Sequence, residues 1–488
     1  MIRENKYPEA LKNARIVPLL KSGKSPEDPA SYRPIANLSV IDKVIESLLK
    51  NQLESHLENE GLIPMEHHGS RKEHSTMTCK ISIDNGIAET VDNKKNALVL
   101  TTDLTACFDV VDHRLILEKM KHLNIVDESI DLLENFLSNR TFIIDIQGFC
   151  TTKIKQPPCS IIQGSCFSGF LMNISALEVP LLPEIMNHPE LASKIAKRKI
   201  EKTENVVHNS HSYVDDNCNV IGTDTHTELE KYTQDYYDVL KGHYSDNKLK
   251  LNESKTSFMV MRTASQRESN ARVKIKVAEN EEKYDDRAVK ILGWWINKRM
   301  NMSTNLQRLK GIISMKVSKL RPIMKYMNLE IRKEVVYSKI GSILLYGSPL
   351  YCGHMQEIKN NLTAQLMKLN RLIYMNNTYK MSNQKICMLI NVEMPDQMIK
   401  KNTLNLIHKL MIKKKPQSIL NRIRENRHSR SSAKINLNLN LRTKKAKRSV
   451  LYRGIKLYNS IPTQLKSLSV KLFKKRIKKY HINEVADD

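Results

Sequence analysis

Three aspartates are the residues whose types and spacing are best suited to chemistry. Asp103 ends the apolar, β-branched run "ALVLTTDL", and Asp215 with Asp216 lies between two apolar flanks in "HSYVDDNCNVIG". Carboxylates held close together raise one another's pKa unless a cation neutralises them. Two Mg²⁺ ions would do so, and would clamp the attacking and leaving oxygens of an in-line phosphoryl transfer. Taken alone, the three residues fit ordinary surface turns better, because Asp is common in turns.

The elements that must position these aspartates can be predicted from the pattern of apolar residues. The run ending at Asp103 predicts a strand, and the residues around Asp215 predict the tip of a β-hairpin. A second hairpin is predicted around Gly148 in "TFIIDIQGFCTTKIKQ". Apolar positions recur at helical spacing over 41–57, which predicts an amphipathic helix, and a long helical pattern covers 225–250.

Composition indicates a folded, multi-part chain with a polyanionic partner. A length of 488 residues suggests two to four packed units, and 40% hydrophobic residues with few Gly and Pro argue against disorder. The 79 Lys and Arg exceed the 52 Asp and Glu and give a net charge of +27. Such an excess favours nucleic acid, because each neutralised phosphate releases a counterion, although a solvated basic surface is the plainer alternative.

The cysteines and the apolar segments restrict where the chain works. The eight Cys include no C-x-x-C pair, which argues against a zinc finger and against a secreted disulfide framework, and favours a reducing, intracellular compartment. No segment near the start is typical of a signal peptide. The most apolar stretch, 343–351, is short and contains Gly and Pro, so no membrane partner is expected.

A series of motifs surrounds the aspartates over nearly the whole chain. In order they are "ARIVPLLKSG", "SYRPIANLSVIDKVIE", "HGSRKEHST", "TTDLTACFDVVDHRLI", "SIIQGSCFSGFL", "SYVDD", "KLKLNESKT", "VKILGWWI" and the closing "LYNSIPTQLK" with "KLFKKRIKKY". In order and spacing they resemble the reverse transcriptases of non-LTR (LINE-type, jockey-like) retrotransposons. This resemblance changes the odds for the aspartates, since coincidence does not produce so many motifs in one order.

The resemblance implies an α+β, right-hand polymerase with a basic, mostly helical C-terminal extension. Fingers and a palm with an antiparallel sheet would occupy 1–300, a helical thumb 301–405, and the extension 406–488. The implied function is an RNA-directed DNA polymerase that copies element RNA into DNA by two-metal-ion nucleotidyl transfer, primed from a nicked target. Its partners would be an RNA template, a DNA primer or target, and dNTPs, in a ribonucleoprotein of the nucleus and cytoplasm.

The resemblance also assigns roles around the catalytic centre. Asp103 and Asp215 would ligate two Mg²⁺ ions, with Mn²⁺ as an alternative metal, and Asp216 would be a weaker ligand or an orienting charge. Lys255 would protonate the pyrophosphate leaving group, although a lone Lys beside a strand is more often a solvated charge. Phe108 would exclude a ribose 2′-hydroxyl, and its plainer alternative is core packing.

Further residues would bind the nucleotide and the nucleic acid. Lys21 and Arg33 match residues that grip the triphosphate, for which an Arg fork is suited. Gln163 and Gly164 match the segment that lines the templating base, where Gly allows a close backbone approach. Phosphate contacts are expected from a set of basic residues, with a nuclear-import signal or a solvated face as alternatives: Arg71, Lys444, Lys445, Lys447, Arg448, Lys474, Lys475 and Arg476.

Departures from the family pattern keep other functions open. Ser70, Cys107, Ile162, Val214 and Gly169 each stand where the family usually has another residue, and none of these changes removes an expected metal ligand. A catalytically weak or domesticated nucleic-acid-binding remnant is therefore the main alternative. An RNA-dependent RNA polymerase and a group II intron maturase are further ones. The chain begins inside the pattern, so the parent element's endonuclease domain is expected to be absent from it.

Overall fold

The computed structural model describes residues 4–21, 23–261, 273–279, 281–375, 381–425, 435–438 and 441–482. Its centre is a four-stranded antiparallel sheet, the palm sheet, with strand order β7-β8-β3-β9. The strands are β7 (Val207–Tyr213), β8 (Asp216–Thr223), β3 (Asn96–Thr102) and β9 (Ser257–Met261). This confirms the strand and the hairpin predicted around the aspartates.

Helices cover both faces of the palm sheet. Successive side chains of a strand point to opposite faces. On β3, Leu98 and Leu100 belong to one core with α9 (His226–Asp246), whereas Ala97 and Val99 belong to another with α2 (Thr76–Asp92). Because both faces are buried, β3 has a continuous apolar sequence and its last residue carries Asp103 to the edge of the sheet.

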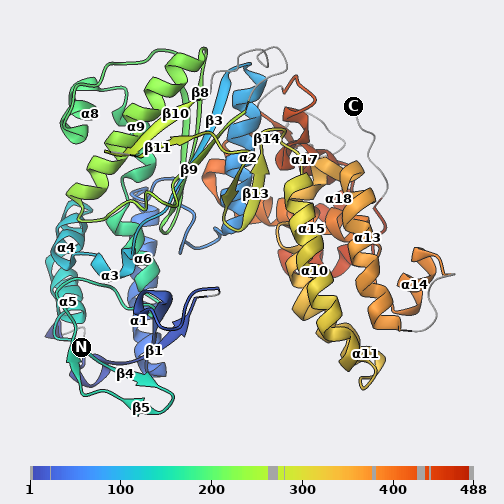
Figure 1. The fold of residues 1–488 in the computed structure, drawn as a ribbon, viewed down its shortest axis with the longest axis horizontal. Coiled ribbons are helices and arrows are strands. Elements are labelled where there is room, and N and C mark those ends of the chain that lie inside the picture. The colour runs from blue at the N-terminus through green and yellow to red at the C-terminus, as the bar shows by residue number, and fades with distance from the viewer. Residues whose placement is uncertain are drawn as a thin grey trace.

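A second, mixed sheet lies in the N-terminal part and forms the fingers with the helices beside it (Figure 1). Its strand order is β2-β1-β4-β5, with β6 also paired to β4, and only β1 and β4 run parallel. The strands are β1 (Asn13–Leu20), β2 (Tyr32–Asn37), β4 (Thr141–Ile146), β5 (Phe149–Cys150) and β6 (Ile154–Lys155). The hairpin predicted around Gly148 is therefore confirmed as β4 and β5.

The helix predicted over 41–57 is confirmed as α1 (Val40–Asn59), but its buried face differs from the expected one. Leu49 and Leu57 are buried as expected, whereas Ile41, Val44 and Leu48 are 65%, 56% and 59% exposed, and two carboxylates are fully buried instead. The buried carboxylates, Asp42 and Glu46, lie beside a buried arginine that supplies the opposite charge.

Short helices and two hairpins complete the fingers and palm. The helices are η2 (Glu9–Leu11), η3 (Pro29–Ser31), α3 (Cys107–Val110), α4 (His113–His122), α5 (Asp127–Leu137), α6 (Ser168–Ser175), η4 (Val179–Leu181), α7 (Leu182–Ile185) and α8 (Pro189–Ala196). The hairpins are β10 (Lys274–Ala278) with β11 (Glu281–Tyr284), and β12 (Ala288–Ile291) with β13 (Trp294–Asn297).

Beyond residue 300 the described chain is almost entirely helical, as predicted. The elements are α10 (Ser303–Met324), α11 (Leu329–Val336), η6 (Tyr337–Gly341), α12 (Ser342–Leu345), η7 (Ser348–His354), α13 (Met355–Tyr374), α14 (Asn383–Leu389), α15 (Pro395–Lys413), α16 (Gln417–Leu420), β14 (Ile423–Glu425), β15 (Ile435–Leu437), η8 (Ala446–Arg448), α17 (Val450–Asn459), α18 (Thr463–Lys466) and α19 (Val470–Ile477). Figure 1 shows α10, α11 and α13 on one side of the palm sheet and the fingers on the other. In the described part of the chain, no helix is both long and apolar enough to span a membrane.

One hydrophobic core joins the expected thumb and the expected extension. Leu306 and Leu369, from 301–405, share this core with Ile455, Phe473 and Ile477 from 406–488. The last part of the chain is thus packed into the helical unit, and a domain boundary at residue 405 stays a prediction.

Acidic residues of α2 and of the loop before it anchor the basic C-terminal part. Asp92 accepts hydrogen bonds from the backbone N–H groups of Arg442 and Thr443, at 2.9 and 2.7 Å. Asp84 accepts one from Val450 N at 2.9 Å. Further ion pairs join Glu89 to Arg422, Glu58 to Lys415, and Glu73 to Lys409 and Lys413. Part of the positive charge of this region is therefore neutralised within the chain.

Asp84 gives a test of this anchoring through pH. Burial raises the pKa of Asp84 to about 6, against 3.8 for an ordinary Asp. The folded protein therefore binds a proton that the unfolded chain does not, and stability should rise as the pH falls through about 6. Asp84→Asn resembles the protonated form and keeps an oxygen for Val450 N–H. We expect it to be more stable than the wild type at pH 8 by about 1–3 kcal/mol in urea unfolding.

Asp92→Asn is the matched control for this prediction. Although burial acts to raise the pKa of Asp92, the hydrogen bonds from Thr443 and Arg442 outweigh it and hold that pKa below its ordinary value. This group stabilises the fold when ionised, so Asp92→Asn should lower stability at pH 8. A loss of stability in both variants at pH 8 would contradict the opposite signs.

Candidate active site

The palm sheet brings the three aspartates to one edge. Thr102 pairs with Asn217, so Asp103, the next residue, comes opposite Asp216 at the start of β8. Tyr213 pairs with Asp216 and closes the hairpin that holds Asp215 in its two-residue turn. The register of two neighbouring strand pairs therefore fixes the three carboxylates near one another.

The turn of this hairpin has a strained backbone and a close neighbour. Val214 has a φ of +60°, a left-handed conformation that is rare for a β-branched residue. Gly69 lies against it: a Cβ at position 69 would come 2.4 Å from Val214 N and 2.6 Å from its Cγ2. Asn173 Nδ2 donates to the Gly69 carbonyl at 2.5 Å, and His68 N donates to Ser212 O at 2.9 Å. Gly69 is thus held in contact with the turn that carries Asp215.

Lys255 lies at the same edge and pairs with Asp103. Its ammonium group donates to Asp103 Oδ2. The loop that carries Lys255 is attached to β3, because Asn252 N donates to the Asp103 carbonyl at 2.8 Å and Lys255 N donates to Asn252 O at 3.1 Å. The predicted catalytic residues Asp103 and Lys255 are therefore in direct contact.

The electrostatics of the site favour a bound cation. Burial raises the pKa of Asp215, and the charge of Asp103 adds to this effect, which Lys255 opposes. Burial, together with repulsion from Asp215 and Asp103, raises the pKa of Asp216 to about 6. Carboxylates that repel one another in this way form an acceptor set that a divalent cation would neutralise.

The side chains do not form a ready-made metal cage. Over the described ranges, no group of three or more His, Cys, Asp or Glu side chains is arranged to hold a metal ion. The ion pair explains part of this, since the Asp103 carboxylate is turned to Lys255, whose ammonium supplies the positive charge. The donor types and their repulsion fit a divalent cation, and the convergence of the three side chains stays a prediction.

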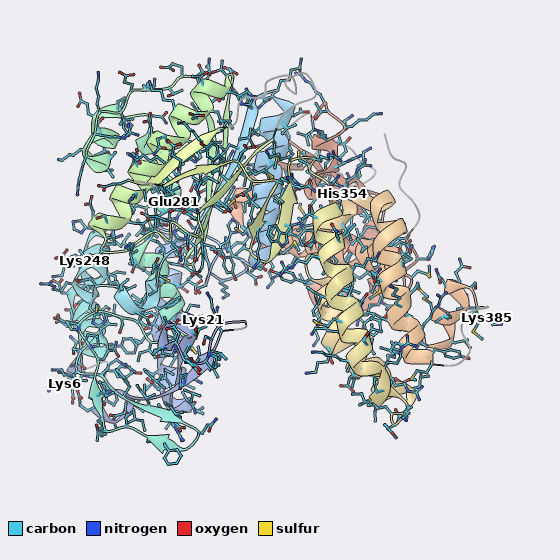
Figure 2. All side chains as sticks on the ribbon, in the orientation of Figure 1. Lys6, Lys21, Lys248, Glu281, His354 and Lys385 are labelled. Carbon is cyan, nitrogen blue, oxygen red and sulfur yellow. The ribbon has the colours of Figure 1, made fainter. Side chains whose placement is uncertain are left out.

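The expected nucleotide-binding residues line the route from the fingers to the palm. Lys21 follows β1 and donates to Ala30 O at 2.8 Å, and Figure 2 shows it on the side of the fingers that faces α10 and α11. Arg33 is exposed on β2 and forms no hydrogen bond or ion pair with any residue that the structure describes. Phe108 is half-buried and packs against the main core, so its geometry agrees with both of its expected roles.

The loop with Gln163 and Gly164 contacts both the fingers and the palm. Ala36 N, on β2, donates to Gln163 O at 2.7 Å. Gly164 has a φ of +124°, and a Cβ there would come 2.4 Å from Ala36 O, so only glycine allows this approach. Gln163 Nε2 donates to Asp109 Oδ1 at 3.3 Å.

Sequence reasoning missed Asp109. Burial raises its pKa, while Gln163 and the charge of Lys21 oppose the rise, so Asp109 connects two predicted nucleotide-binding residues. The signal was present in "TACFDVVD", one residue after Phe108, but an acid in a short loop is unremarkable until its neighbours are known.

The structure corrects the expectation for Arg71. Its side chain is only 8% exposed and pairs with Glu58, while Nη1 donates to the carbonyls of Pro64 and His67 at 2.6 and 3.0 Å. Its donors are already used inside the protein, so Arg71 stabilises the loop before α2 and is not available to a phosphate. Sequence alone could not place these carbonyls around the guanidinium.

The C-terminal basic residues are placed differently. Lys474, Lys475 and Arg476 are exposed on α19, and Lys444 and Arg448 are exposed beside η8. Lys445 and Lys447 are half-buried in the same segment. A role of these seven residues in binding nucleic acid stays a prediction.

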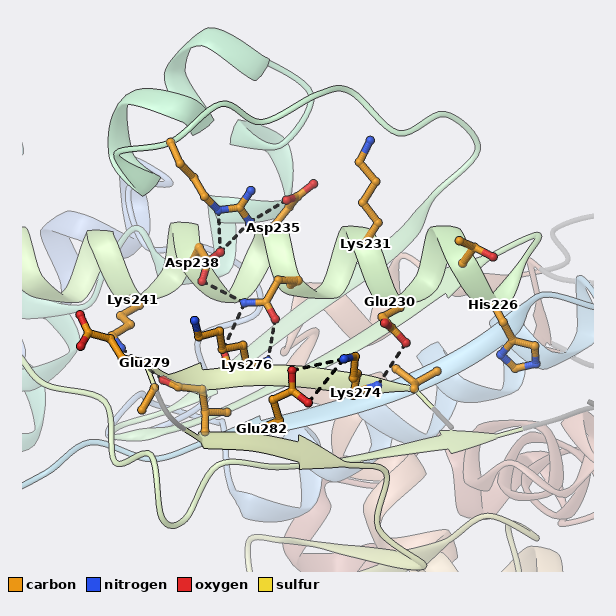
Figure 3. Close-up of a pocket in the computed structure, with 16 residues that line it drawn as sticks. His226, Glu230, Lys231, Asp235, Asp238, Lys241, Lys274, Lys276, Glu279 and Glu282 are labelled. Atoms are coloured by element: carbon orange, nitrogen blue, oxygen red, sulfur yellow. Dashed lines mark hydrogen bonds and ion pairs between the residues drawn. The ribbon is translucent and has the colours of Figure 1, made fainter. Parts of the chain in front are cut away.

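A large open cavity of about 830 Å³ lies away from the aspartates, between α9 and the β10–β11 hairpin (Figure 3). Its charges are largely paired: Arg198 bridges Asp235 and Asp238, and Lys274 pairs with Glu282. Gln234 exchanges hydrogen bonds with the backbone of Lys276 and so covers the free edge of β10. This cavity has a structural explanation and is not the candidate active site.

Comparison with known proteins decides the family. The sequence profile described as reverse transcriptase (RNA-dependent DNA polymerase) matches residues 20–296, more than half of the chain. The chain belongs to the reverse transcriptase family. The match runs from the end of β1 to β13 and so includes the three aspartates, Lys255 and the loop of Gln163. The right-hand fold expected from the sequence follows from this membership.

Similar proteins come from non-LTR mobile elements. The RNA-directed DNA polymerase from mobile element jockey of Drosophila melanogaster is 31% identical over 174 residues, 36% of this chain and 19% of that protein. The probable RNA-directed DNA polymerase from transposon BS of the same fly is 26% identical over 181 residues, 37% of this chain and 20% of that protein. The resemblance to jockey-like reverse transcriptases is confirmed, and the matched segment spans about a fifth of these relatives.

Two more distant similarities extend the comparison. The Pol polyprotein from type-1 retrotransposable element R2 of Popillia japonica is 27% identical over 178 residues, 36% of this chain and 24% of that protein. Among solved structures, apo telomerase from Candida tropicalis, truncated from its C-terminal domain, is 11% identical with a TM-score of 0.37. That similarity covers 60% of this chain and 55% of the telomerase chain.

Proposed function

We propose that this reverse transcriptase chain copies RNA into DNA with dNTPs, from a DNA primer supplied by a nicked target. The observation that carries the proposal is the placement of Asp103 opposite Asp216, with Asp215 in the adjoining turn, inside the segment that matches the family. The proposed setting is a ribonucleoprotein of the nucleus and cytoplasm, as for a mobile element that copies its own RNA.

In the proposed reaction, Asp103 and Asp215 hold the divalent cations and Asp216 adds orienting charge. Mg²⁺ is the proposed metal, with Mn²⁺ as a substitute, and it would stabilise charge on the attacking and leaving oxygens. Lys255 already contacts Asp103. It is therefore placed to move from this carboxylate to the leaving pyrophosphate and to donate a proton there.

The fingers would bind and select the nucleotide. Exposed Arg33 and the nearby Lys21 offer charge-assisted hydrogen bonds to the triphosphate. Gln163 and Gly164 would contact the base pair that forms, because their loop reaches from β2 to Asp109. Phe108 follows Asp103 by five positions and would lie under the sugar.

The test of this function is template-directed synthesis by the purified chain. An RNA template annealed to a labelled DNA primer, with dNTPs and Mg²⁺, should give full-length extension that EDTA abolishes. Extension only when the template is omitted, or only with rNTPs, would refute the proposal. A DNA template of the same sequence serves as the comparison for template preference.

Phe108→Ala tests sugar selection. If the ring excludes the 2′-hydroxyl, its removal should let rNTPs be incorporated and raise the rNTP to dNTP ratio by about tenfold or more, the factor that 1.4 kcal/mol of discrimination supplies. Single-nucleotide extension with matched dNTP and rNTP gives this ratio. Phe108→Tyr, which keeps the ring, is the control. An unchanged ratio in Phe108→Ala would assign the ring to core packing.

The exposed charges of α19 give a separate prediction for nucleic-acid binding. Replacing Lys474, Lys475 and Arg476 with Gln should flatten the slope of log K against log [salt] by about 0.7–0.9 for each phosphate that the helix no longer neutralises. Substitution is more informative than truncation, because Phe473 and Ile477 of this helix lie in the core. Binding to a labelled primer-template across a salt series measures the slope.

Lys409 and Lys413 provide the charge-matched control. Both ammonium groups pair with Glu73 inside the protein, so replacing them with Gln should leave the salt slope unchanged. Equal slopes for the α19 variant and the wild type would assign those charges to solubility or nuclear import.

A further inference from the structure

A cluster of buried charges lies behind the loop of Gln163. Asp42 and Glu46 are both 0% exposed on α1, and Arg140 and Tyr7 are 2% and 1% exposed. Tyr7 OH donates to Asp42 Oδ1, and the Arg140 guanidinium lies 3.6 Å from Asp42 Oδ2. Buried charges are costly unless paired and hydrogen-bonded, so this arrangement requires a reason beyond packing.

Glu46 extends the cluster to the nucleotide-binding loop. Its Oε2 accepts a hydrogen bond from Cys166 N at 2.8 Å. Cys166 comes two residues after Gly164, so the bond holds the end of the segment that carries Gln163. Asp42 lies one helical turn away in the same cluster, where it accepts a hydrogen bond from Tyr7 and pairs with Arg140.

The other side of this loop is held by backbone contacts. Ile161 N donates to Phe108 O at 2.7 Å, and Ala36 N donates to Gln163 O at 2.7 Å. The loop is thus held between α1 on one side and β2 and α3 on the other. A shift of its end would move Gln163 relative to Asp109 and to the segment of Phe108.

We propose that Glu46 is a positioning residue for nucleotide binding, which fixes the 163–166 loop through its hydrogen bond to Cys166 N. It contacts neither nucleotide nor metal and acts through the loop. The inference rests on the proposed polymerase function. It goes beyond that function because it gives a buried acid of the fingers helix a specific effect on nucleotide affinity.

Three conservative variants separate this role from a general contribution to stability. Glu46→Asp keeps the charge but shortens the reach to Cys166 N, whereas Glu46→Gln keeps the reach and an acceptor oxygen without the charge. Asp42→Asn removes the same charge as Glu46→Gln from the same cluster without altering the hydrogen bond to the loop. The measurements are kcat and KM for dNTP in primer extension, and the melting temperature of each variant.

Glu46→Asp should raise KM for dNTP by about tenfold, the size expected for the loss of one hydrogen bond to a charged acceptor, with kcat within about twofold. Glu46→Gln and Asp42→Asn should keep a wild-type KM whatever their melting temperatures. A wild-type KM for Glu46→Asp would overturn the proposal. An equal rise in KM for Glu46→Asp and Asp42→Asn would also overturn it, because the cluster would then act through stability.

Hydrogen exchange makes the test independent of activity. In the peptide that contains 160–167, amide exchange should be faster in Glu46→Asp than in the wild type, and unchanged in Asp42→Asn. If the wild type extends no primer, the polymerase function has failed, and this exchange alone decides whether Glu46 holds the loop. Wild-type exchange in Glu46→Asp would show that it does not.

Discussion

Asp215→Asn should abolish primer extension while leaving the affinity for primer-template intact. The substitution keeps the size of the side chain and removes one charge from a carboxylate that lies in the turn between β7 and β8. Metal-assisted charge stabilisation is worth several kcal/mol, so the rate should fall by about a thousandfold or more. Extension rates at saturating dNTP, with binding measured separately on the same primer-template, check both parts of the prediction.

Asp109→Asn is the control for this experiment. Asp109 is a nearby acid that hydrogen-bonds Gln163 and lies on α3, away from the hairpin turn. Its replacement should affect KM for dNTP more than the rate at saturation. Wild-type rates in Asp215→Asn would remove this residue from the catalytic centre.

Gly69→Ala should reduce extension by about a hundredfold, the loss expected from a displacement of about 1 Å at catalytic groups. A Cβ at position 69 would overlap Val214 N, and the bond from Asn173 to the Gly69 carbonyl prevents the loop from moving away. The hairpin turn would therefore shift and carry Asp215 with it. Extension rate and melting temperature should be measured together, because the effect is expected mainly on the rate.

Gly86→Ala is the matched control for Gly69→Ala. Gly86 lies on α2, and an added Cβ would meet only Asn209, at an ordinary contact distance of 3.6 Å. It should leave the rate unchanged and favour the helix slightly. If Gly69→Ala extends primers like the wild type, the contact with Val214 does not control the hairpin.

The palm could be predicted from the sequence because its signals are local. The continuous apolar run before Asp103 and the turn at Asp215 each specify an element within a few residues. The family motifs then gave their order in the fold, and the match over 20–296 confirmed the family. The side-chain geometry at the metal site did not follow, because the pairing of Asp103 with Lys255 joins segments that are far apart in the sequence.

The errors arose where distant residues decide the outcome. Helical spacing indicated that the apolar residues of α1 would be buried, yet Arg140, far along the chain, makes burial of Asp42 and Glu46 favourable. In the same way, the basic C-terminal part was interpreted as an extension. Its acidic partners, such as Asp84 and Asp92, lie on α2 and could not be identified from local charge alone.

The most direct test of the metal site is a crystal structure of the chain with primer-template, a non-hydrolysable dNTP and Mn²⁺, measured at the manganese absorption edge. Our account predicts anomalous peaks within coordination distance of Asp103 and Asp215, about 2.0–2.3 Å from their oxygens. Lys255 should have moved from Asp103 towards the triphosphate. Anomalous peaks located elsewhere, with Lys255 still paired to Asp103 in the presence of nucleotide, would contradict it.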